Sequence, residues 1–194
     1  MPRIGMKPIR RASLVEAAIA EIGDSGSLNV TVSRIAQRAG VSSALAHHYF
    51  GTKESILLSA MRHILSVYSA DVRAALAGAA DHRGRVEAVV RASFAPEQFR
   101  PAVISAWLMF YVGAQRSPET ARLLAIYKRR LRSNLLAGLR PLVGREAELA
   151  AEGVAALIDG LYIRQSLARG APPDSAEATA VVLDYVNRVL GSRP

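Results

Sequence analysis

Apolar residues recur along most of the chain at the spacing that places them on one face of an α-helix. Leu14, Ala18 and Ile22 form such a stripe over a predicted first helix at about 9–23. Runs of β-branched residues in strict alternation, which are typical of strands, do not occur in the sequence, and Gly or Pro interrupts the helical pattern repeatedly. The sequence therefore predicts an all-α fold of about nine helices.

Capping residues mark the start of two of these helices. Ser117 precedes Pro118, an arrangement that is typical of a first helical turn, and the helix is expected to run toward Gly144. Asp174 lies just after a pair of prolines and predicts the start of a last amphipathic helix over 174–190.

Charge and composition narrow the class of protein. The 194 residues carry a formal net charge of +9, which favours polyanionic partners such as nucleic acid. The chain has no Cys, so disulfides and thiolate metal sites are excluded. The most apolar run, 102–114, is shorter than the roughly 20 residues that a membrane crossing needs. We expect a cytoplasmic protein that does not contact a membrane.

One segment has the pattern of a helix-turn-helix. Thr31 is a natural N-cap for a helix in which Ile35 faces inward, and Gly40 suits the left-handed residue that ends it. Ser42 is placed to cap a second, short helix, which Gly51 ends. A helix, a tight glycine turn and a short helix predict a motif whose second helix enters the DNA major groove.

Side chains around this motif suit DNA contact. Small or polar residues on the second helix, Ser43, Ala44, His47 and His48, would let it approach the bases, and hydroxyl or lysine side chains would bind phosphates. Adjacent histidines on a helix point about 100° apart, so no metal site is predicted from His47 and His48. The candidate DNA-contacting residues of this segment are Thr31, Ser42, Ser43, Ala44, His47, His48, Tyr49, Thr52 and Lys53.

The stretch VTVSRIAQRAGVSSALAHHYFGTKESIL resembles the DNA-binding signature of TetR-family transcriptional repressors. The matching features are Thr31, the Ala-Gly-Val-Ser turn, the aromatic-rich recognition helix and the Lys-Glu pair at 53–54. The chain departs from many family members at His47, where they carry Tyr, and at Ala44, where they carry Gly. The resemblance implies a DNA-binding domain over 1–52, a ligand-binding and dimerisation domain over 53–194, and double-stranded operator DNA as a partner.

Within that family the chain is similar to the BetI-type repressors, on the basis of the stretches MPRIGMKPIRRASLVEAAI, HYF, AWLMFY and ALIDGLYIRQSL. The resemblance implies control of genes that convert choline to glycine betaine, with release from the operator by choline. The N-terminal stretch also contains a basic arm without acids, which either follows phosphates or a minor groove, or is a solvated tail. Its basic residues are Arg3, Lys7, Arg10 and Arg11.

Aromatic residues of the larger C-terminal part are candidates for an effector site. Trp107, Phe110 and Tyr111 share one helix face, and Asp159 shares another with Tyr162. Aromatic faces attract quaternary ammonium groups, and a carboxylate adds Coulomb attraction, so these residues would suit a small cation such as choline. The ligand-binding candidates are Trp107, Phe110, Tyr111, Tyr127, Asp159 and Tyr162.

Plain structural roles remain open for the same residues. An aromatic stripe at helical spacing is also typical of an ordinary core. Asp159 could face solvent or pair with Arg164 or Arg130. The basic cluster at 127–134 is expected to be a solvated helix face, with a contribution to DNA approach as the alternative.

Small and branched residues on the last two helices predict a homodimer through a four-helix interface. The dimerisation candidates are Gly153, Ala156, Leu157, Gly160, Val182, Val186, Val189 and Leu190. The sequence has no phosphate-cradling glycine loop and no metal-ligand set, so an enzyme is not predicted, nor is a cofactor. The alternative function is a regulator of the same architecture that responds to a different lipophilic, amine or acyl effector.

Overall fold

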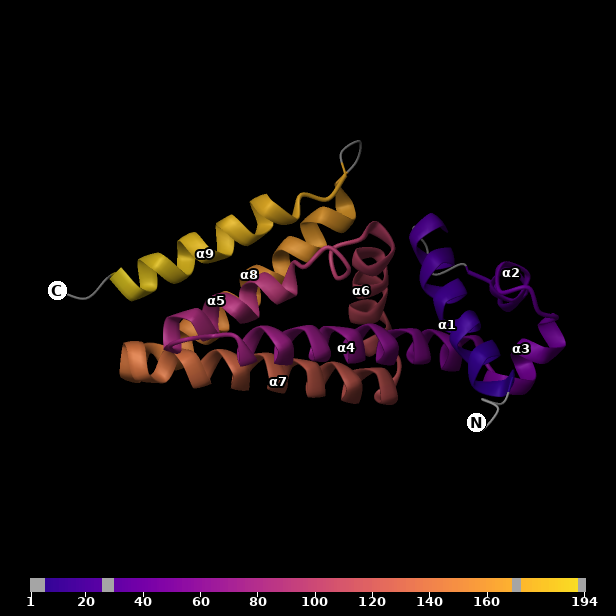
Figure 1. Cartoon of the computed structure of the whole chain (residues 1–194). Helices are drawn as coiled ribbons and strands as arrows, with labels where there is room; N and C mark the ends of the chain where they lie inside the picture. The colour runs from indigo at the N-terminus through magenta and orange to yellow at the C-terminus, as the bar shows by residue number, and fades with distance from the viewer. Residues whose placement is uncertain (1–5, 26–29, 169–171, 192–194) are drawn as a thin grey trace.

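The structure is a computed structural model that describes residues 6–25, 30–168 and 172–191. Within these ranges the chain forms nine α-helices and one short 3-10 helix, without strands (Figure 1), which confirms the predicted all-α fold. The helices are α1 (Met6–Ser25), α2 (Val32–Arg38), α3 (Ser43–Phe50), α4 (Lys53–Ala77), α5 (His82–Ser93), α6 (Pro101–Ala114), α7 (Pro118–Val143), η1 (Gly144–Glu146), α8 (Ala147–Leu167) and α9 (Ser175–Gly191).

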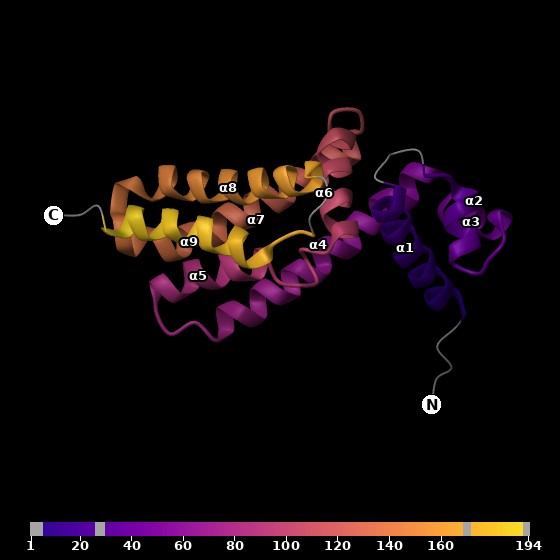
Figure 2. The ribbon, with the colours of Figure 1, turned by 90° about the horizontal axis from the view of Figure 1, so that it is seen from above.

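The helices are arranged as a small head and a larger body. The head, α1 to α3, lies at one end of the molecule, and the body, α4 to α9, extends away from it (Figure 1). Helix α4 begins beside the head and runs along α7 into the body, so it joins the two parts. Figure 2 shows α8 and α9 side by side on one face of the body.

Capping side chains begin the helices where the sequence predicts them. The hydroxyl oxygens of Thr31 and Ser42 accept from the backbone N–H groups of Arg34 and Leu45, each at 3.2 Å. Gly40 ends the first helix of the motif with φ of 67°, a conformation that other residues adopt only with strain. The predicted starts at Ser117 and Asp174 are confirmed in the same way, because both side chains accept backbone N–H groups at 3.3 and 2.8 Å.

Helix α1 begins earlier than predicted, at Met6 rather than at about residue 9. Pro8 does not prevent this, because N–H groups of a first helical turn have no partner within the helix and proline is tolerated there. Lys7, Arg10 and Arg11 therefore lie on the helix itself, and the prediction of a basic arm preceding the helix is wrong for these three residues. Arg3 lies outside the described residues.

A continuous apolar core runs from the head through the body. Helix α1 packs closely on α6 at Gly23, where an added Cβ would lie 2.5 Å from the Cβ of Ala102. This close approach joins the head to the first turn of α6. A bulkier residue at Gly23 would push the two helices apart.

The structure corrects part of the predicted dimer surface. Val182 and Val186 are at most 1 % exposed within the single chain, so they stabilise the core and cannot meet a partner. Gly153 packs against the Tyr185 ring of α9 in the same chain and does not make room for another one. The sequence pattern identified an apolar helix face, but this face covers the chain's own body.

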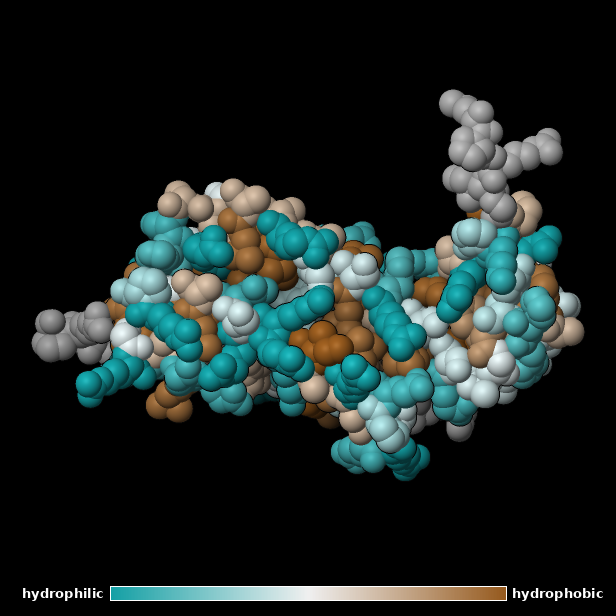
Figure 3. All heavy atoms as spheres, turned by 90° about the horizontal axis from the view of Figure 1, so that it is seen from below, coloured by the Kyte–Doolittle hydropathy of each residue, from teal (hydrophilic) through white to brown (hydrophobic). Residues whose placement is uncertain are grey.

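Charged and polar residues cover most of the body's outer face near α4 and α7, with smaller apolar areas between them (Figure 3). Lys128, Arg129 and Arg130 are exposed on α7, as expected for a solvated face, and Arg132 pairs with Glu148 of α8. None of the helices in the described ranges is both long and apolar enough to cross a membrane.

Candidate DNA-binding surface and effector site

The recognition helix α3 has an inner and an outer side. Ala46 and Phe50 are buried and fix the helix to the head, while Ala44, His47 and His48 are exposed on the outer side. Ser43 is half-buried, and its hydroxyl donates to Ser33 at 3.3 Å. The outward side chains are small or polar, so the backbone of α3 can approach an opposing surface closely.

The ring of His47 is oriented by a hydrogen bond. Its Nδ1 lies 2.9 Å from the carbonyl oxygen of Gly51, and a carbonyl only accepts, so Nδ1 carries a proton. In the neutral ring the outer nitrogen, Nε2, is then an acceptor. His48 and Tyr49 lie beside each other with ring centroids 5.6 Å apart.

The capping hydroxyls around α3 also suit phosphate binding. In Thr31 and Ser42 the side-chain oxygen accepts a backbone N–H, which leaves each hydroxyl proton able to donate to a phosphate oxygen. Thr52 accepts the backbone N–H of Ser55 and donates its own hydroxyl to Ser55 Oγ at 3.2 Å. All three residues are exposed. Lys53 begins α4 immediately after Thr52, at the helix end whose dipole favours anions.

Basic residues of α1 lie next to this surface. The guanidinium of Arg11 sits 5.0 Å from the centre of the Phe50 ring, a cation–π contact that connects α1 to the end of α3. Lys7 and Arg10 are exposed on the same helix. The sequence analysis identified the charges, but the stacking of Arg11 on Phe50 emerges only from the fold.

A buried carboxylate holds the two halves of the head together. Glu21 of α1 is 5 % exposed, and it accepts from Arg38 Nε at 2.7 Å and pairs with Arg34 Nε at 3.0 Å. Both arginines belong to α2, so these contacts orient the helix-turn-helix on α1. The sequence analysis did not identify Glu21, although its spacing of seven residues from Leu14 places it on the apolar stripe of α1.

The aromatic candidates of the body gather around Trp107. The Trp107 ring lies 4.6 Å from Tyr127, 5.7 Å from Phe110, and 5.9 Å from both Tyr111 and Tyr162. Three of these rings come from α6, and α7 and α8 each add one ring from a distant part of the sequence. Most are buried, whereas Tyr111 is partly accessible.

Asp159 lies beside this cluster. Tyr127 donates its hydroxyl to the Asp159 carboxylate at 3.3 Å. Burial raises the pKa of Asp159, and hydrogen bonds from Tyr111 and Tyr127 and the charge of Lys128 partly oppose that rise. In the described residues Asp159 forms no ion pair, so the alternatives that pair it with Arg164 or Arg130 are wrong, as is a fully solvent-facing position.

Further aromatic residues extend the cluster and were not predicted. Phe94 and Phe99 pack on Tyr162 with centroid distances of 5.9 and 5.2 Å, and Tyr68 lies 5.9 Å from Tyr127. Burial raises the pKa of Tyr68 to about 12, so its hydroxyl stays protonated. Phe94 and Phe99 flank a short connection between two helices, a position in which the sequence offers no periodicity to reveal them.

Metal binding has no support in the described ranges, where no three His, Asp or Glu side chains are grouped for a metal ion.

Two family models match separate parts of the chain. Residues 14–60 match the model for bacterial regulatory proteins of the tetR family, and residues 82–191 match that for the C-terminal part of BetI-type transcriptional repressors. This chain belongs to the TetR family and to its BetI type.

Relatives support that membership over the whole length of the BetI-type chain. A regulator from Rhizobium meliloti strain 1021, named HTH-type transcriptional regulator BetI, is 55% identical over 98% of this chain and 94% of its own. Among solved structures, a transcriptional regulator from Pseudomonas aeruginosa PAO1 is 26% identical, with a TM-score of 0.80, over 98% of this chain and 94% of its own. The BetI-type relatives are transcription regulators, which confirms that an enzyme was rightly not predicted.

A second solved structure bears on the effector. A transcriptional regulator from Saccharomonospora viridis, in complex with choline, is 25% identical with a TM-score of 0.77, over 91% of this chain and 95% of its own. The chain is thus a DNA-binding transcriptional regulator of the BetI type, and it shares its fold with a regulator that was solved in complex with choline.

Proposed function

We propose that this BetI-type regulator is a homodimeric repressor of genes for the conversion of choline to glycine betaine, and that choline releases it from its operator. The observation that carries the proposal is the grouping of Trp107, Tyr127 and Tyr162 with the partly buried carboxylate of Asp159. The relatives' name and the choline complex of the S. viridis regulator support it.

The chemistry of the site favours a quaternary ammonium ion. Such an ion has no N–H groups and is held by the negative faces of aromatic rings and by Coulomb attraction. Asp159 supplies the charge, and Trp107 and its neighbours supply the ring faces. An acyl effector with a carboxylate would meet like charge at Asp159, which disfavours that alternative. A lipophilic amine remains the competing ligand class.

Dimerisation would use the exposed side of α8 and α9. Large apolar residues are exposed there, with Leu149 at 78 %, Leu167 at 64 % and Val181 at 43 %. On α8, Ala156 and Gly160 lie between them, and an added Cβ at Gly160 would meet nothing within 4 Å. A helix of a second chain could therefore approach closely. Leu157, Val189 and Leu190 are half-buried and stay candidates at its margin.

A dimer would present two copies of α3 to two half-sites of the operator. Choline would release the protein if it favours an arrangement of the body in which the separation of the two heads no longer matches those half-sites. Only a difference in choline affinity between the two arrangements can shift the equilibrium. The proposed domain boundary at 52–53 lies where Thr52 caps α4, the helix that joins head and body.

The test combines two measurements on the full-length protein. Trp107 is the single tryptophan, so its fluorescence should change saturably as choline is added. The same choline concentrations should release a retarded fragment of the target promoter. The neutral control is 3,3-dimethylbutan-1-ol, which has the shape of choline without the charge and should do neither. A flat fluorescence trace with choline, or an equal response to the neutral alcohol, would contradict the proposal.

A further inference from the structure

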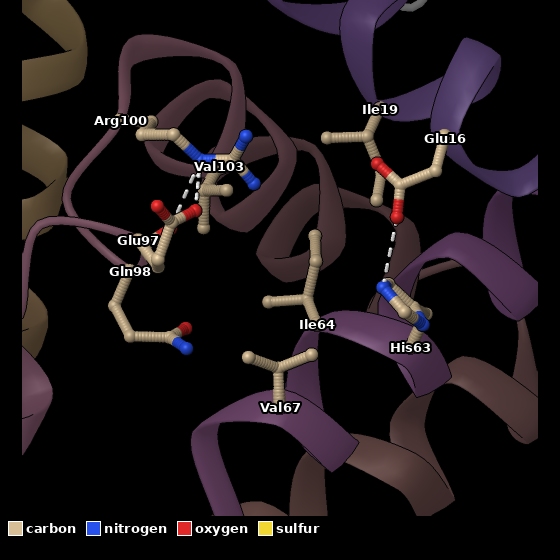
Figure 4. Close-up of a pocket in the computed structure, with 9 residues that line it drawn as sticks. All are labelled: Glu16, Ile19, His63, Ile64, Val67, Glu97, Gln98, Arg100 and Val103. Carbon is tan, nitrogen blue, oxygen red and sulfur yellow. Dashed lines mark hydrogen bonds and ion pairs between the residues drawn. The ribbon is translucent and has the colours of Figure 1, made fainter. Parts of the chain in front are cut away.

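A cavity lies between the head and the body, and none of the proposed effector residues lines it (Figure 4). Its volume of about 230 Å³ corresponds to several water molecules, since one takes about 30 Å³ in the liquid. Helix α1 provides Glu16 and Ile19, and α4 provides His63, Ile64 and Val67. The rest of its wall comes from the segment that leads into α6 and from its first turn, namely Glu97, Gln98, Arg100 and Val103.

The cavity has an apolar floor and a charged rim. Ile19, Ile64 and Val103 are at most 3 % exposed and form the floor. Two ion pairs face each other across the opening (Figure 4): Glu16 with His63 at 2.9 Å, and Glu97 with Arg100 at 3.3 Å. This combination suits a small molecule that has an aliphatic body and one charged end.

The charges on the rim determine whether the charged end of the ligand is a cation or an anion. The carboxylates of Glu16 and Glu97, together with Asp71 behind Gln98, outnumber the guanidinium of Arg100 and the imidazole of His63, which is a cation only when it is protonated. Arg100 Nε is also committed to Glu97, both to its carboxylate and to its backbone carbonyl at 3.2 Å. In a chain of net charge +9, this cavity is a local site that favours a cation.

The side-chain amide of Gln98, in the cavity wall, offers a hydrogen-bond acceptor. Gln98 is 2 % exposed and extends from its segment toward the cavity (Figure 4). Its Nε2 donates to Asp71 Oδ2 at 2.9 Å, which fixes the orientation of the amide and makes the other atom, Oε1, the acceptor. No donor to Oε1 is found among the described residues, and Oε1 is not one of their fully buried atoms that lack a partner, so solvent in the cavity reaches it. A ligand N–H in the cavity can replace that solvent.

We propose that this cavity binds a small aliphatic ammonium ion that carries N–H groups, such as a primary amine in its protonated form. The ammonium group donates to Gln98 Oε1 and to a rim carboxylate of Glu16 or Glu97, and the alkyl chain lies on Ile19, Ile64 and Val103. Choline has no N–H groups, so its nitrogen cannot make these hydrogen bonds, and its hydroxyl is its single donor. The proposed site therefore differs from the aromatic cluster in the ammonium class that it favours.

The position of the cavity connects its ligand to the head. Glu16 belongs to α1, whereas His63 and Gln98 belong to the body, so a bound amine contacts both parts at once. The backbone carbonyl of Gln98 also accepts from the hydroxyl of Tyr162 at 3.2 Å. The segment around Gln98 thus lies between the second site and the effector cluster.

Calorimetric titration of the full-length protein with n-butylammonium chloride tests the proposal, with tetramethylammonium chloride and sodium butyrate as probes at equal ionic strength. Butylammonium should bind saturably to protein already saturated with choline. Tetramethylammonium, which lacks N–H groups, and butyrate, which has the opposite charge, should show no saturable heat under the same conditions. Saturable binding of butyrate, or no binding of butylammonium, would overturn the proposal.

Variants separate this site from the aromatic cluster. Glu16→Gln and Glu97→Gln combined in one chain should weaken butylammonium binding about tenfold, since together they remove the charge partner of the ammonium whichever of the two carboxylates it is. This double variant should leave choline binding unchanged, and Asp159→Asn should do the reverse. Glu146→Gln, an exposed acid distant from the cavity, is the matched control. Butylammonium binding that depends on Asp159 but not on Glu16 or Glu97 would place the amine in the effector site and refute a second one.

Discussion

The hydroxyl of Tyr162 lies 2.5 Å from the backbone carbonyl oxygen of Ser93, a residue 69 positions earlier in the chain. The same hydroxyl lies 3.2 Å from the carbonyl of Gln98. Tyr162 therefore bonds to the last residue of α5 and to the connection that leads into α6, while its ring contacts Trp107 in the proposed effector site. Helix α6 follows this connection and packs on α1 of the head at Ala102.

Replacement of Tyr162 by Phe should uncouple effector binding from operator release. The ring faces remain for choline, so its affinity should change less than about threefold, whereas the connection at 93–98 loses its link to the ligand. Choline should then release operator DNA less effectively from the variant. Fluorescence titration and promoter retardation measure the two properties separately. A parallel loss of both would show that Tyr162 acts in binding alone.

Asp159→Asn should weaken choline binding and stabilise the ligand-free protein. The substitution removes the charge partner of the ligand but keeps an oxygen that accepts from Tyr127. Because burial raises the pKa of Asp159, the ionised group costs stability when no cation is present. We expect about tenfold weaker choline binding and a higher Tm without ligand. A purely structural carboxylate would give the opposite sign in Tm, which thermal unfolding distinguishes.

The affinity for choline should depend on pH through the same residue. Choline keeps its charge at every pH, so a change in affinity reports the protein. Because the pKa of Asp159 is raised, its carboxylate is protonated as pH falls through that raised value, and affinity should fall by up to about tenfold per pH unit below it. Titrations of the wild type over acidic to neutral pH measure this slope. The slope should vanish in Asp159→Asn, and its persistence there would assign it to another group.

The local chemistry of the sequence predicted the head well. Caps at Thr31 and Ser42 and the glycine at position 40 depend on interactions within a few residues, and the structure confirms each. The contacts of Trp107 with Tyr127 and Tyr162 depend on how three helices pack, so the sequence alone could not show them. The sequence did identify these residues as candidates, because aromatic residues are rare in the chain.

Other features depend on which neighbour covers a helix face, which periodicity does not reveal. Val182 and Leu167 both belong to apolar patterns, but the first is buried in the chain's own core and the second is exposed. The amide of Gln98 lies in a short irregular segment, where neither helical spacing nor a motif indicates burial. Whether such residues are buried or exposed can be assigned only from the three-dimensional structure.

The arginines of α1 should contribute to operator affinity through phosphates. Arg10→Ala and Arg11→Ala should each weaken binding to all operator sequences alike, and each should reduce the slope of log affinity against log salt by about 1. Arg129→Ala on α7, far from the head, is the control and should leave the slope unchanged. Retardation assays over a range of salt concentrations measure it. An unchanged slope in both α1 variants would exclude α1 from the DNA contact.

The exposed apolar residues of α8 should be required for the proposed dimer. In a two-fold interface each residue occurs twice, so burial of Leu149 and Leu167 would stabilise the dimer by about 1.5–3 kcal/mol per side chain and protomer. Leu149→Glu and Leu167→Glu should therefore shift the protein toward a monomer in sedimentation velocity. Operator affinity should fall with them, because a monomer contacts one half-site only.

Ala137→Glu on the exposed side of α7 is the matched control for an added charge and should leave the dimer intact. Helical content should stay unchanged in all three variants, since the replaced side chains are exposed within the single chain. Dissociation caused by Ala137→Glu, together with intact dimers of both leucine variants, would move the interface from α8 to α7. The operator half-sites would then have to be matched by a different arrangement of the two heads.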